Sequence, residues 1–317
     1  MLYATTRSKA DSYTEHRTLC EDRASNGGFF VPFRMPQLDQ SQIADLKKRS
    51  FGENVSFVLN LFFPGSITSW DVDCSIGKNP AEVFSVKQRI LLAKLCDNPQ
   101  GAYGYICDRL FAKLCSGKTN TVTEWANIAI RIAVLFGIYG IMQDLQSESF
   151  DICVNCRDFS DPMAAWYARC MGLPIGRILC ICDDDSLIWD FLHKGELDTG
   201  ANAFQTHMSS KSSPAPVGVE RLIFATLGYE QTQKYLQITS QKRVFHLLPE
   251  QLKKLNDGMF ACVVSKERAQ SVKTAFRGNY SHRISASVAA AYAGLQDFRA
   301  QTGESKYSLL LWDQEND

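Results

Sequence analysis

Apolar residues recur with two different periods along this chain, and the clearest unit that they predict runs from 150 to 181. Residues 152–154 form a short apolar run that is typical of a buried strand. The next segment predicts a helix that Ser160 caps and Gly172 ends, and residues 177–182 predict a second strand. A strand–helix–strand unit of this size predicts two parallel strands within an α/β sheet.

Apolar residues at helical spacing predict helices over most of the remaining chain. Residues 84–95 and 105–114 follow this spacing, and residues 123–139 are so uniformly apolar that we expect a buried helix. Residues 66–80 and 195–218 are rich in turn formers and predict loops. Further helices are predicted at 41–49, 51–63, 187–193, 219–227, 230–239, 249–256, 266–276 and 285–298, and short strands at 29–31 and 307–312.

Residues 155–160 join the first predicted strand to the helix that follows it. Such a loop lies at the carboxyl end of a strand and the amino end of a helix, where free N–H groups favour a phosphate. The residues conflict with this position, because the loop has no glycine that would let main-chain N–H groups approach an anion. Arg157 can pair with a phosphate, but Asp158 beside it repels an anion.

Composition limits the classes of function. A chain of 317 residues can bury a large core, and we expect an opening module at 1–50 followed by an α/β domain at 51–317. The formal net charge is zero, so a general attraction to nucleic acid or to anionic membranes is not expected. We expect no signal peptide and no membrane span, and therefore a cytoplasmic protein.

Two groups of side chains raise the question of a metal. Cys153 and Cys156 have C-x-x-C spacing, and Cys180 and Cys182 are expected on the next strand, so a zinc or thiol site is one interpretation. The alternative is that these cysteines fill strand positions as small apolar side chains, since no second C-x-x-C follows. Residues 183–185 are three aspartates, which favour either a divalent cation or, more simply, the start of a helix.

Several stretches, in consistent order, resemble the threonine synthase family. Members of this family are fold-type-II enzymes that use pyridoxal phosphate to convert phosphohomoserine to threonine. The resemblance covers about two-thirds of the chain and implies a tryptophan-synthase-β-like α/β fold with a parallel sheet flanked by helices. The stretches are YATTR at 3–7, NGGFFVP at 26–32, EWANIA at 124–129, the unit at 150–181, the segment at 183–197, VERLIF at 219–224, and 285–298 with Thr302 and Gly303.

The chain departs from the family where the chemistry is done. The family's F-K-D motif, which supplies the Schiff-base lysine, and the S-G-D-T-G loop after it are both absent, so much of the cofactor-lysine domain is predicted to be missing. Lysines do occur in the corresponding region, but none stands in F-K-D or before a glycine-rich loop. We expect these lysines on helix surfaces, and they are Lys87, Lys94, Lys113 and Lys118.

The resemblance also identifies a vestigial phosphate loop, in which the family has T-G-N-F-G-D and this chain has lost both glycines. Its candidate cofactor-binding residues are Cys156, Arg157, Asp158, Phe159 and Ser160. The family's closing T-A-H-P-x-K-F segment, which caps the cofactor ring, is replaced by the sequence from Leu309 to Asp313.

These losses predict a catalytically silent relative with a binding or regulatory role, and no catalytic residue or metal ligand is assigned. No cofactor is expected, or pyridoxal phosphate if the ancestral site survives. The expected partners are a second copy of the chain or an active threonine synthase homolog. The two alternatives are a working pyridoxal-phosphate lyase with a rearranged site, and a thiol or metal site around Cys153, Cys156, Cys180 and Cys182.

Overall fold

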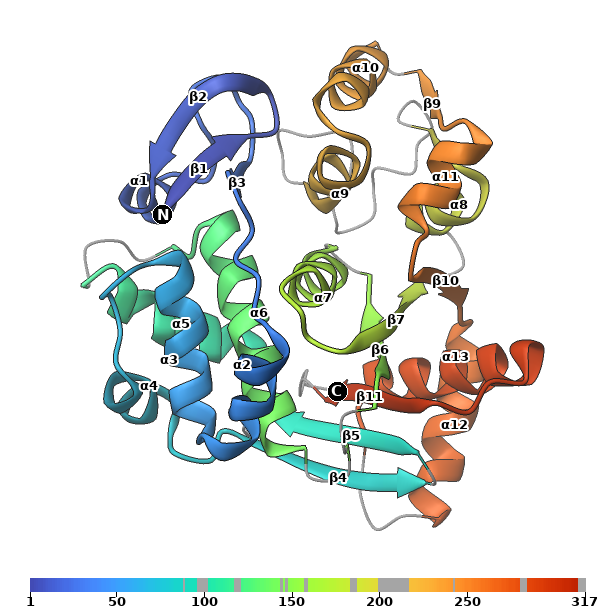
Figure 1. Cartoon of the computed structure of the whole chain (residues 1–317). Helices are drawn as coiled ribbons and strands as arrows, with labels where there is room; N and C mark the ends of the chain where they lie inside the picture. Colours follow the sequence, from blue (N-terminus) through green and yellow to red (C-terminus); the bar gives the residue numbers. More distant parts are fainter. Residues whose placement is uncertain are drawn as a thin grey trace.

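A central sheet of mostly parallel strands organises the computed structural model (Figure 1). The structure describes residues 1–87, 89–95, 102–116, 121–142, 145, 148–156, 159–182, 187–198, 217–241, 243–279 and 284–312. Within these ranges the sheet has the strand order β10-β7-β6-β11-β5-β4, and all neighbours are parallel except β4 and β5. The predicted α/β class is therefore confirmed. The strands are β4 Ala81–Lys87, β5 Ile90–Leu95, β6 Phe150–Asn155, β7 Ile175–Cys182, β10 Met259–Val263 and β11 Tyr307–Trp312.

Helices cover both faces of this sheet, so its inner strands are buried on two sides. In β5, Leu91 and Ala93 belong to the core under α3, α6 and α7, whereas Leu92 belongs to the core under α12 and α13. Alternation along a strand sends neighbouring side chains to opposite faces, which explains two cores within one sheet. The bounds are α3 Phe51–Phe62, α6 Glu124–Ile141, α7 Ser160–Cys170, α12 Lys266–Asn279 and α13 Ala286–Thr302.

The predicted buried helix is α6. Thr123 caps its amino end, because the Thr123 hydroxyl accepts a hydrogen bond from the N–H of Ala126 at 3.4 Å. Its length and apolar composition would allow it to cross a membrane, but 72% of it is buried inside the fold. Trp125, near its start, is fully buried. This helix is therefore a core helix of the fold.

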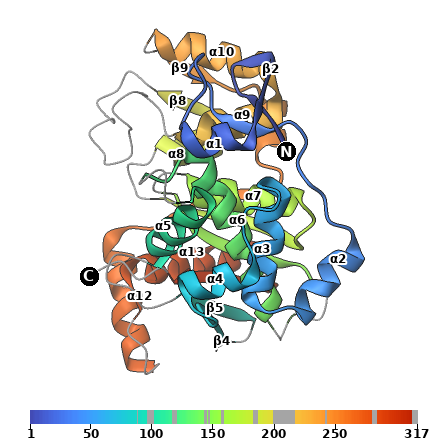
Figure 2. The same cartoon turned by 90° about the vertical axis from the view of Figure 1, so that its left-hand side faces the viewer.

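A second, antiparallel sheet forms the amino-terminal part of the chain, with the order β2-β1-β3. Figures 1 and 2 both show these strands beside α9 and α10, on the far side of α7 from the α12–α13 pair. The domain boundary expected at residue 50 stays a prediction. The remaining elements are β1 Leu2–Thr5, β2 Ser8–Thr14, α1 Glu15–Cys20, β3 Phe30–Pro32, α2 Gln40–Asp45, α5 Ala102–Leu114, α8 Leu187–Lys194, α9 Val217–Leu227, α10 Tyr229–Ser240, β9 Val244–His246 and α11 Pro249–Leu255.

The prediction of a helix at 84–95 is wrong, because this segment forms the β4–β5 hairpin. Residues 90–93 form a continuous apolar run, which fits either a buried helix or a strand that is buried on both faces. Parallel pairing of β5 with β11 brings Leu91 beside Leu309 and Leu92 beside Leu310, and this long-range contact decides in favour of the strand.

Two predicted loops also contain regular structure. Within 66–80, α4 spans Ser69–Ile76 and begins with a reciprocal capping box between Thr68 and Asp71. Within 195–218, β8 spans Glu196–Asp198 and pairs with β9, and α9 begins at Val217. The sequence signal that would have found α4 was the T-x-x-D pattern at 68–71, which is a capping box with aspartate in place of glutamate.

Candidate functional site

The candidate site lies where β6 ends and α7 begins, at the carboxyl edge of the sheet. β6 and β7 pair in parallel with α7 between them, as predicted, and Gly172 ends the helix with φ at +106°. The N–H of Cys156 donates to the carbonyl of Ile181 at 3.0 Å, which continues the pairing beyond β6. Ser160 was predicted to cap α7, and this is wrong. It is the first helical residue, and the cap position is held by Phe159.

Phe159, the last loop residue before α7, fills the space at that end of the loop with a buried side chain. Its backbone is left-handed, with φ at +65°, and its side chain is fully buried. The start of α9 packs directly on it, because a Cβ built on Gly218 would lie 2.8 Å from the Phe159 Cβ and 3.1 Å from its carbonyl oxygen. A non-glycine residue in this conformation costs free energy of about 1–3 kcal/mol, which the packing must offset. Phe159 therefore acts as a core residue of the loop.

Three thiols fill the other side of the loop. Burial raises the pKa of Cys156 well above its ordinary value, and the neighbouring thiols of Cys180 and Cys182 act in the same direction. All three cysteines are buried in the core under α7. Buried thiols of this kind pack as small apolar side chains, and the raised pKa of Cys156 keeps that thiol neutral.

Cys153 does not join these thiols. It belongs to the core on the other face of the sheet, together with Leu179 and Ile181. A C-x-x-C pair on an extended strand points to opposite faces, because side chains alternate with a period of two. Within the described ranges no three His, Cys, Asp or Glu side chains are arranged to hold a metal ion. The four cysteines of the predicted metal site therefore do not converge.

The start of α7 already has a negative charge. Asp161, in the first turn, forms an ion pair with Arg131 of α6, and this carboxylate complements the positive end of the helix dipole. The next residue, Pro162, has no N–H to offer to a ligand. The carboxylate at this helix start is therefore already engaged in an ion pair.

The described residues of the loop thus do not fit the phosphate group of pyridoxal phosphate. Cys156, Phe159 and Ser160 are buried side chains in packed surroundings. Arg157 and Asp158 lie outside the described residues, as do the three aspartates at 183–185. The assignment of residues 156–160 to a phosphate loop stays a prediction.

The predicted lysines that the structure describes lie away from this loop, and two of them are on strands. Lys94 is near the carboxyl end of β5, paired with Trp312, and its ammonium lies 5.4 Å from the centre of the indole ring. It is on the correct edge of the sheet, but two strands from β6, a spacing of about 10 Å. Lys87 ends β4 at the opposite edge, Lys113 pairs with Asp71 at 2.8 Å, and Lys118 lies outside the described residues.

Lys47 is a lysine that sequence reasoning missed. Burial lowers its pKa to about 8, a value suited to an amine nucleophile. Its ammonium donates to the carbonyls of Tyr139 (2.6 Å) and Met142, at the end of α6, and lies over the Tyr139 ring. Tyr139 in turn stacks on Phe150, the first residue of β6. This amine is therefore at the wrong end of β6 for the loop.

Three of the recognised motifs meet in a buried cluster, which we call the clasp: Thr6, Arg7, Glu124, Glu220 and Arg221. The Glu220 carboxylate accepts hydrogen bonds from Thr6 Oγ1 at 2.5 Å and from Arg7 Nε and Nη2 at 3.0 and 2.8 Å. These contacts join residues more than 200 positions apart and tie the amino-terminal strands to α9.

Arg221 completes the clasp in the interior. Its guanidinium is fully buried over the Phe29 ring, 4.5 Å from the ring centre, and its Nη1 lies 3.5 Å from a Glu124 carboxylate oxygen. Its Nε and Nη2 have no hydrogen-bond partner among the described residues. Burial lowers the pKa of this arginine, and the Glu124 charge partly opposes that shift. The cluster joins segments of the fold and offers no nucleophile or acid–base pair.

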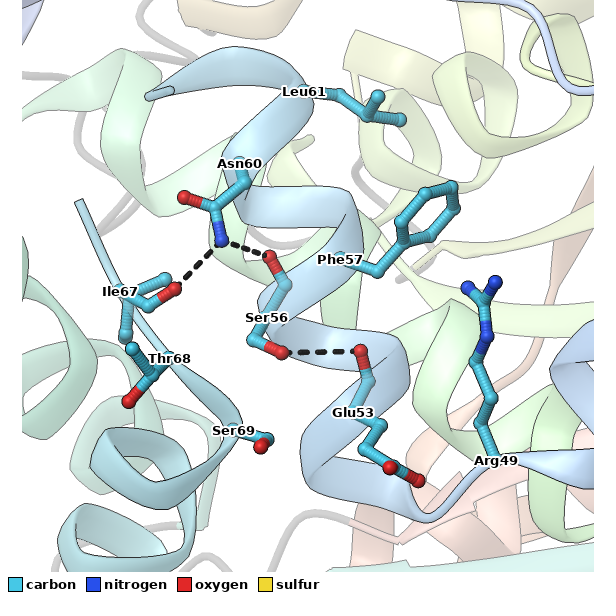
Figure 3. A pocket seen from close by; sticks show the side chains of 9 residues that line it. All are labelled: Arg49, Glu53, Ser56, Phe57, Asn60, Leu61, Ile67, Thr68 and Ser69. Carbon is cyan, nitrogen blue, oxygen red and sulfur yellow. Dashed lines mark hydrogen bonds between the residues drawn. The ribbon is translucent and has the colours of Figure 1, made fainter. Parts of the chain in front are cut away.

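Two cavities stand out in the described residues, and neither is lined by Cys156, Phe159 or Ser160. The first, of about 610 Å³, is a shallow groove along α3 (Figure 3). Its polar side chains already serve local structure: Asn60 donates to the carbonyls of Ser56 and Ile67, at 2.8 and 2.6 Å, and Glu53 caps α3. The second lies at the amino edge of the sheet.

Sequence comparison matches residues 2–78 to the family model described as threonine synthase N terminus. A threonine synthase of Eremothecium gossypii is 27% identical over 101 residues, which are 32% of this chain and 20% of that protein. Threonine synthase-like 1 of Mus musculus is 29% identical over 79 residues, 24% of this chain and 11% of that protein. The matched segments thus span a fifth or less of these relatives.

The fold is also that of solved threonine synthases. The structure of the pyridoxal-phosphate-bound enzyme from Brucella melitensis superposes with a TM-score of 0.82 at 14% identity, covering 98% of this chain and 88% of that chain. The yeast threonine synthase gives a TM-score of 0.78 at 13% identity, covering 98% and 86%. At these identities the likeness shows the fold, which is fold type II as predicted.

Proposed function

We propose that the chain is a catalytically silent relative of threonine synthase and acts as a binding or regulatory protein. Its match to the family's N-terminal model over residues 2–78 and its fold support that relationship. One contrast carries this proposal. The clasp keeps the buried contacts that hold the scaffold together, whereas the described part of the β6–α7 loop is filled by Phe159 and by thiols.

The amines support the same proposal. Catalysis through a Schiff base requires an amine held at the cofactor aldehyde, and the protein must also bind and orient the cofactor. Lys47 has a suitably low pKa but lies at the amino end of β6, and Lys94 lies over Trp312 two strands away. Neither lies at the described part of the loop.

The test is titration of the full chain with pyridoxal phosphate, followed by absorption spectroscopy and by borohydride reduction with peptide mapping. We expect no stoichiometric Schiff-base band. A stoichiometric band that Lys94→Met abolishes and Lys113→Met leaves intact would overturn the proposal. Lys113 is the matched control, because its ammonium pairs with Asp71 on the surface of α4 and α5.

The alternative function is an active pyridoxal-phosphate lyase of threonine synthase type with a rearranged site. The position of Lys94 at the carboxyl edge of β5 is the observation that favours it. Its test is release of inorganic phosphate from phosphohomoserine with formation of threonine. Turnover by the wild type that is lost in Lys94→Met would replace the first proposal with this one.

We propose that the partner is a second copy of the chain or an active threonine synthase homolog. Leu2 and Phe33 support this role, since both are largely exposed and adjacent, with the Phe33 N–H donating to the Leu2 carbonyl at 3.0 Å. The cysteines that the structure describes are all free, which supports a reducing compartment such as the cytoplasm. Light scattering of Phe33→Ser against wild type, alone and mixed with the homolog, tests the partner. Equal masses for both proteins would contradict it.

A further inference from the structure

A cavity of about 630 Å³ opens at the amino edge of the central sheet, opposite to the β6–α7 loop. It lies between the β4–β5 hairpin and the end of α13, which are both at the bottom of Figure 1. Its volume is within the range of small-molecule sites, about 300–1,000 Å³. The side chains that matter for binding are Lys87, Arg89, Tyr292, Gln296, Arg299 and Ser305.

The charged side chains that line this cavity are all positive. Lys87, Arg89 and Arg299 line it, and none of the carboxylates that the structure describes does. The acidic groups nearby are engaged elsewhere: Glu304 pairs with Arg177, and Asp151 is buried and accepts a hydrogen bond from the Arg177 N–H at 2.9 Å. Three cations around one hollow repel one another, and a bound anion would relieve that repulsion.

Arg299 is held in place before any ligand arrives. Its Nη2 donates to the carbonyls of Arg89 and Lys306, at 3.1 and 2.5 Å, and to Ser308 Oγ at 3.0 Å. Burial lowers its pKa, although a guanidinium remains charged at neutral pH. A fixed, partly desolvated guanidinium loses little entropy on binding, and its attraction for an anion is screened less than at the surface.

Arg89 occupies a strained position. Its φ is +59°, in the left-handed region where glycine or asparagine costs less than other residues. The turn needs this conformation, because the Arg89 carbonyl accepts hydrogen bonds from the Ser308 N–H at 2.9 Å and from Arg299. The backbone explains the conformation but not the choice of arginine, whose Nη1 reaches the Ser305 carbonyl at the rim of the cavity.

From this geometry we propose that the cavity binds a small phosphomonoester. The phosphate contacts Lys87, Arg89 and Arg299, and the organic part lies against Tyr292 and Gln296. Three convergent cations, two of them arginines, match the charge and the several acceptor oxygens of a phosphate dianion better than those of a single carboxylate. The site lies at the opposite edge of the sheet from the β6–α7 loop, so the inference holds whether or not that loop binds a cofactor.

The experiment is isothermal titration calorimetry of the full chain with inorganic phosphate, glycerol phosphate and adenosine monophosphate at low and high salt. We expect the esters to bind, and to bind more weakly as salt rises. Lys87→Gln and Arg89→Asn should each weaken binding about tenfold, the usual loss when a hydrogen bond to a charged group is removed. Arg89→Asn suits the left-handed turn, so its thermal transition should not fall below that of the wild type.

Lys306→Gln is the matched control, since it removes an exposed positive charge next to the cavity from a side chain that does not line it. It should bind like the wild type. Absence of binding by every phosphate compound at low salt would overturn the proposal. An equal loss in Lys306→Gln and Arg89→Asn would overturn it too, because binding would then follow net charge alone.

Discussion

The clasp and the β6–α7 loop both carry residues of the recognised motifs, yet the fold uses them differently. In the clasp, Glu220 accepts three hydrogen bonds from Thr6 and Arg7, and Arg221 is buried over Phe29. In the loop, Phe159 is buried against Gly218 and Asp161 is paired with Arg131. The clasp is a polar network that joins distant segments, whereas the described loop is a packed core.

The difference between the clasp and the loop shows that matching motifs can reflect a shared scaffold without a shared ligand site. In the clasp each buried charge needs its partner, because a buried carboxylate or guanidinium without one would cost several kcal/mol. A phosphate loop, in contrast, needs open space and free N–H groups, which serve only the ligand. A chain can therefore keep the first kind of motif without the second.

Phe159→Ala should lower the free energy of unfolding by about 4 kcal/mol, since it removes a fully buried ring from a packed site. Urea unfolding of the purified variant measures this loss. Phe33→Ala is the control, because Phe33 is 71% exposed and its truncation should change stability little. A loss below about 1 kcal/mol for Phe159→Ala would mean that the loop is open and not packed.

Glu220→Gln should lower the free energy of unfolding by about 3 kcal/mol, because it leaves the Arg7 charge without its buried carboxylate partner. The matched control is Glu230→Gln. Glu230, in α10, pairs with Lys9, in β2, but both side chains are exposed. Exposed pairs contribute little, so the two variants should differ clearly in their urea midpoints. Similar midpoints would show that the clasp does not stabilise the fold.

The pH dependence of stability should separate Lys47 from an ordinary lysine. Its folded pKa is lowered from 10.5 to about 8 by burial, so between these values the unfolded chain binds more protons than the folded one. Stability from this group is therefore full above pH 10.5 and is lost as the pH falls to about 8. The stability of wild type minus that of Lys47→Met, measured by urea unfolding at several pH values, should rise across this window. A flat difference would contradict the buried position of the amine.

The smallest effect is expected at Gly104, in the first turn of α5. A Cβ built there meets no atom within 4 Å, so Gly104→Ala should stabilise the protein by about 0.5–1 kcal/mol through helix propensity. Gly137→Ala in α6 is the opposite case, since its Cβ would lie 2.8 Å from the Phe51 ring. Thermal unfolding should show a gain for the first variant and a loss for the second. A loss at Gly104 would mean that the start of α5 is more crowded than the structure shows.

Elements with strong local signals were predicted well from the sequence. The unit at 150–181 became β6, α7 and β7, and the apolar run at 123–139 became α6. The capping residue Thr123 reinforced the helix signal at α6, and the apolar run was too long for a strand. Most of the helices predicted after residue 217 were found in the same way.

Elements that depend on distant partners were missed. The β4–β5 hairpin was predicted as a helix, and β1, β2, β8, β9 and β10 were not predicted at all. In β2 most residues are exposed, so no apolar periodicity marks it, and its pairing with β1 is what makes it a strand. For the candidate site, the position of the loop was predicted, but its filling by Phe159 depends on α9, which begins 58 residues later.

By itself, the sequence determined the α/β class, the order of most helices and the place of the loop between β6 and α7, because periodicity and capping act over a few residues. Only the tertiary structure decided which charges meet and what fills the loop. The clasp unites residues more than 200 positions apart, and the cationic cavity unites a hairpin with the end of α13. Burial and charge pairing are set by segments that are remote in sequence, so they follow from the packing of the whole chain and from no local pattern.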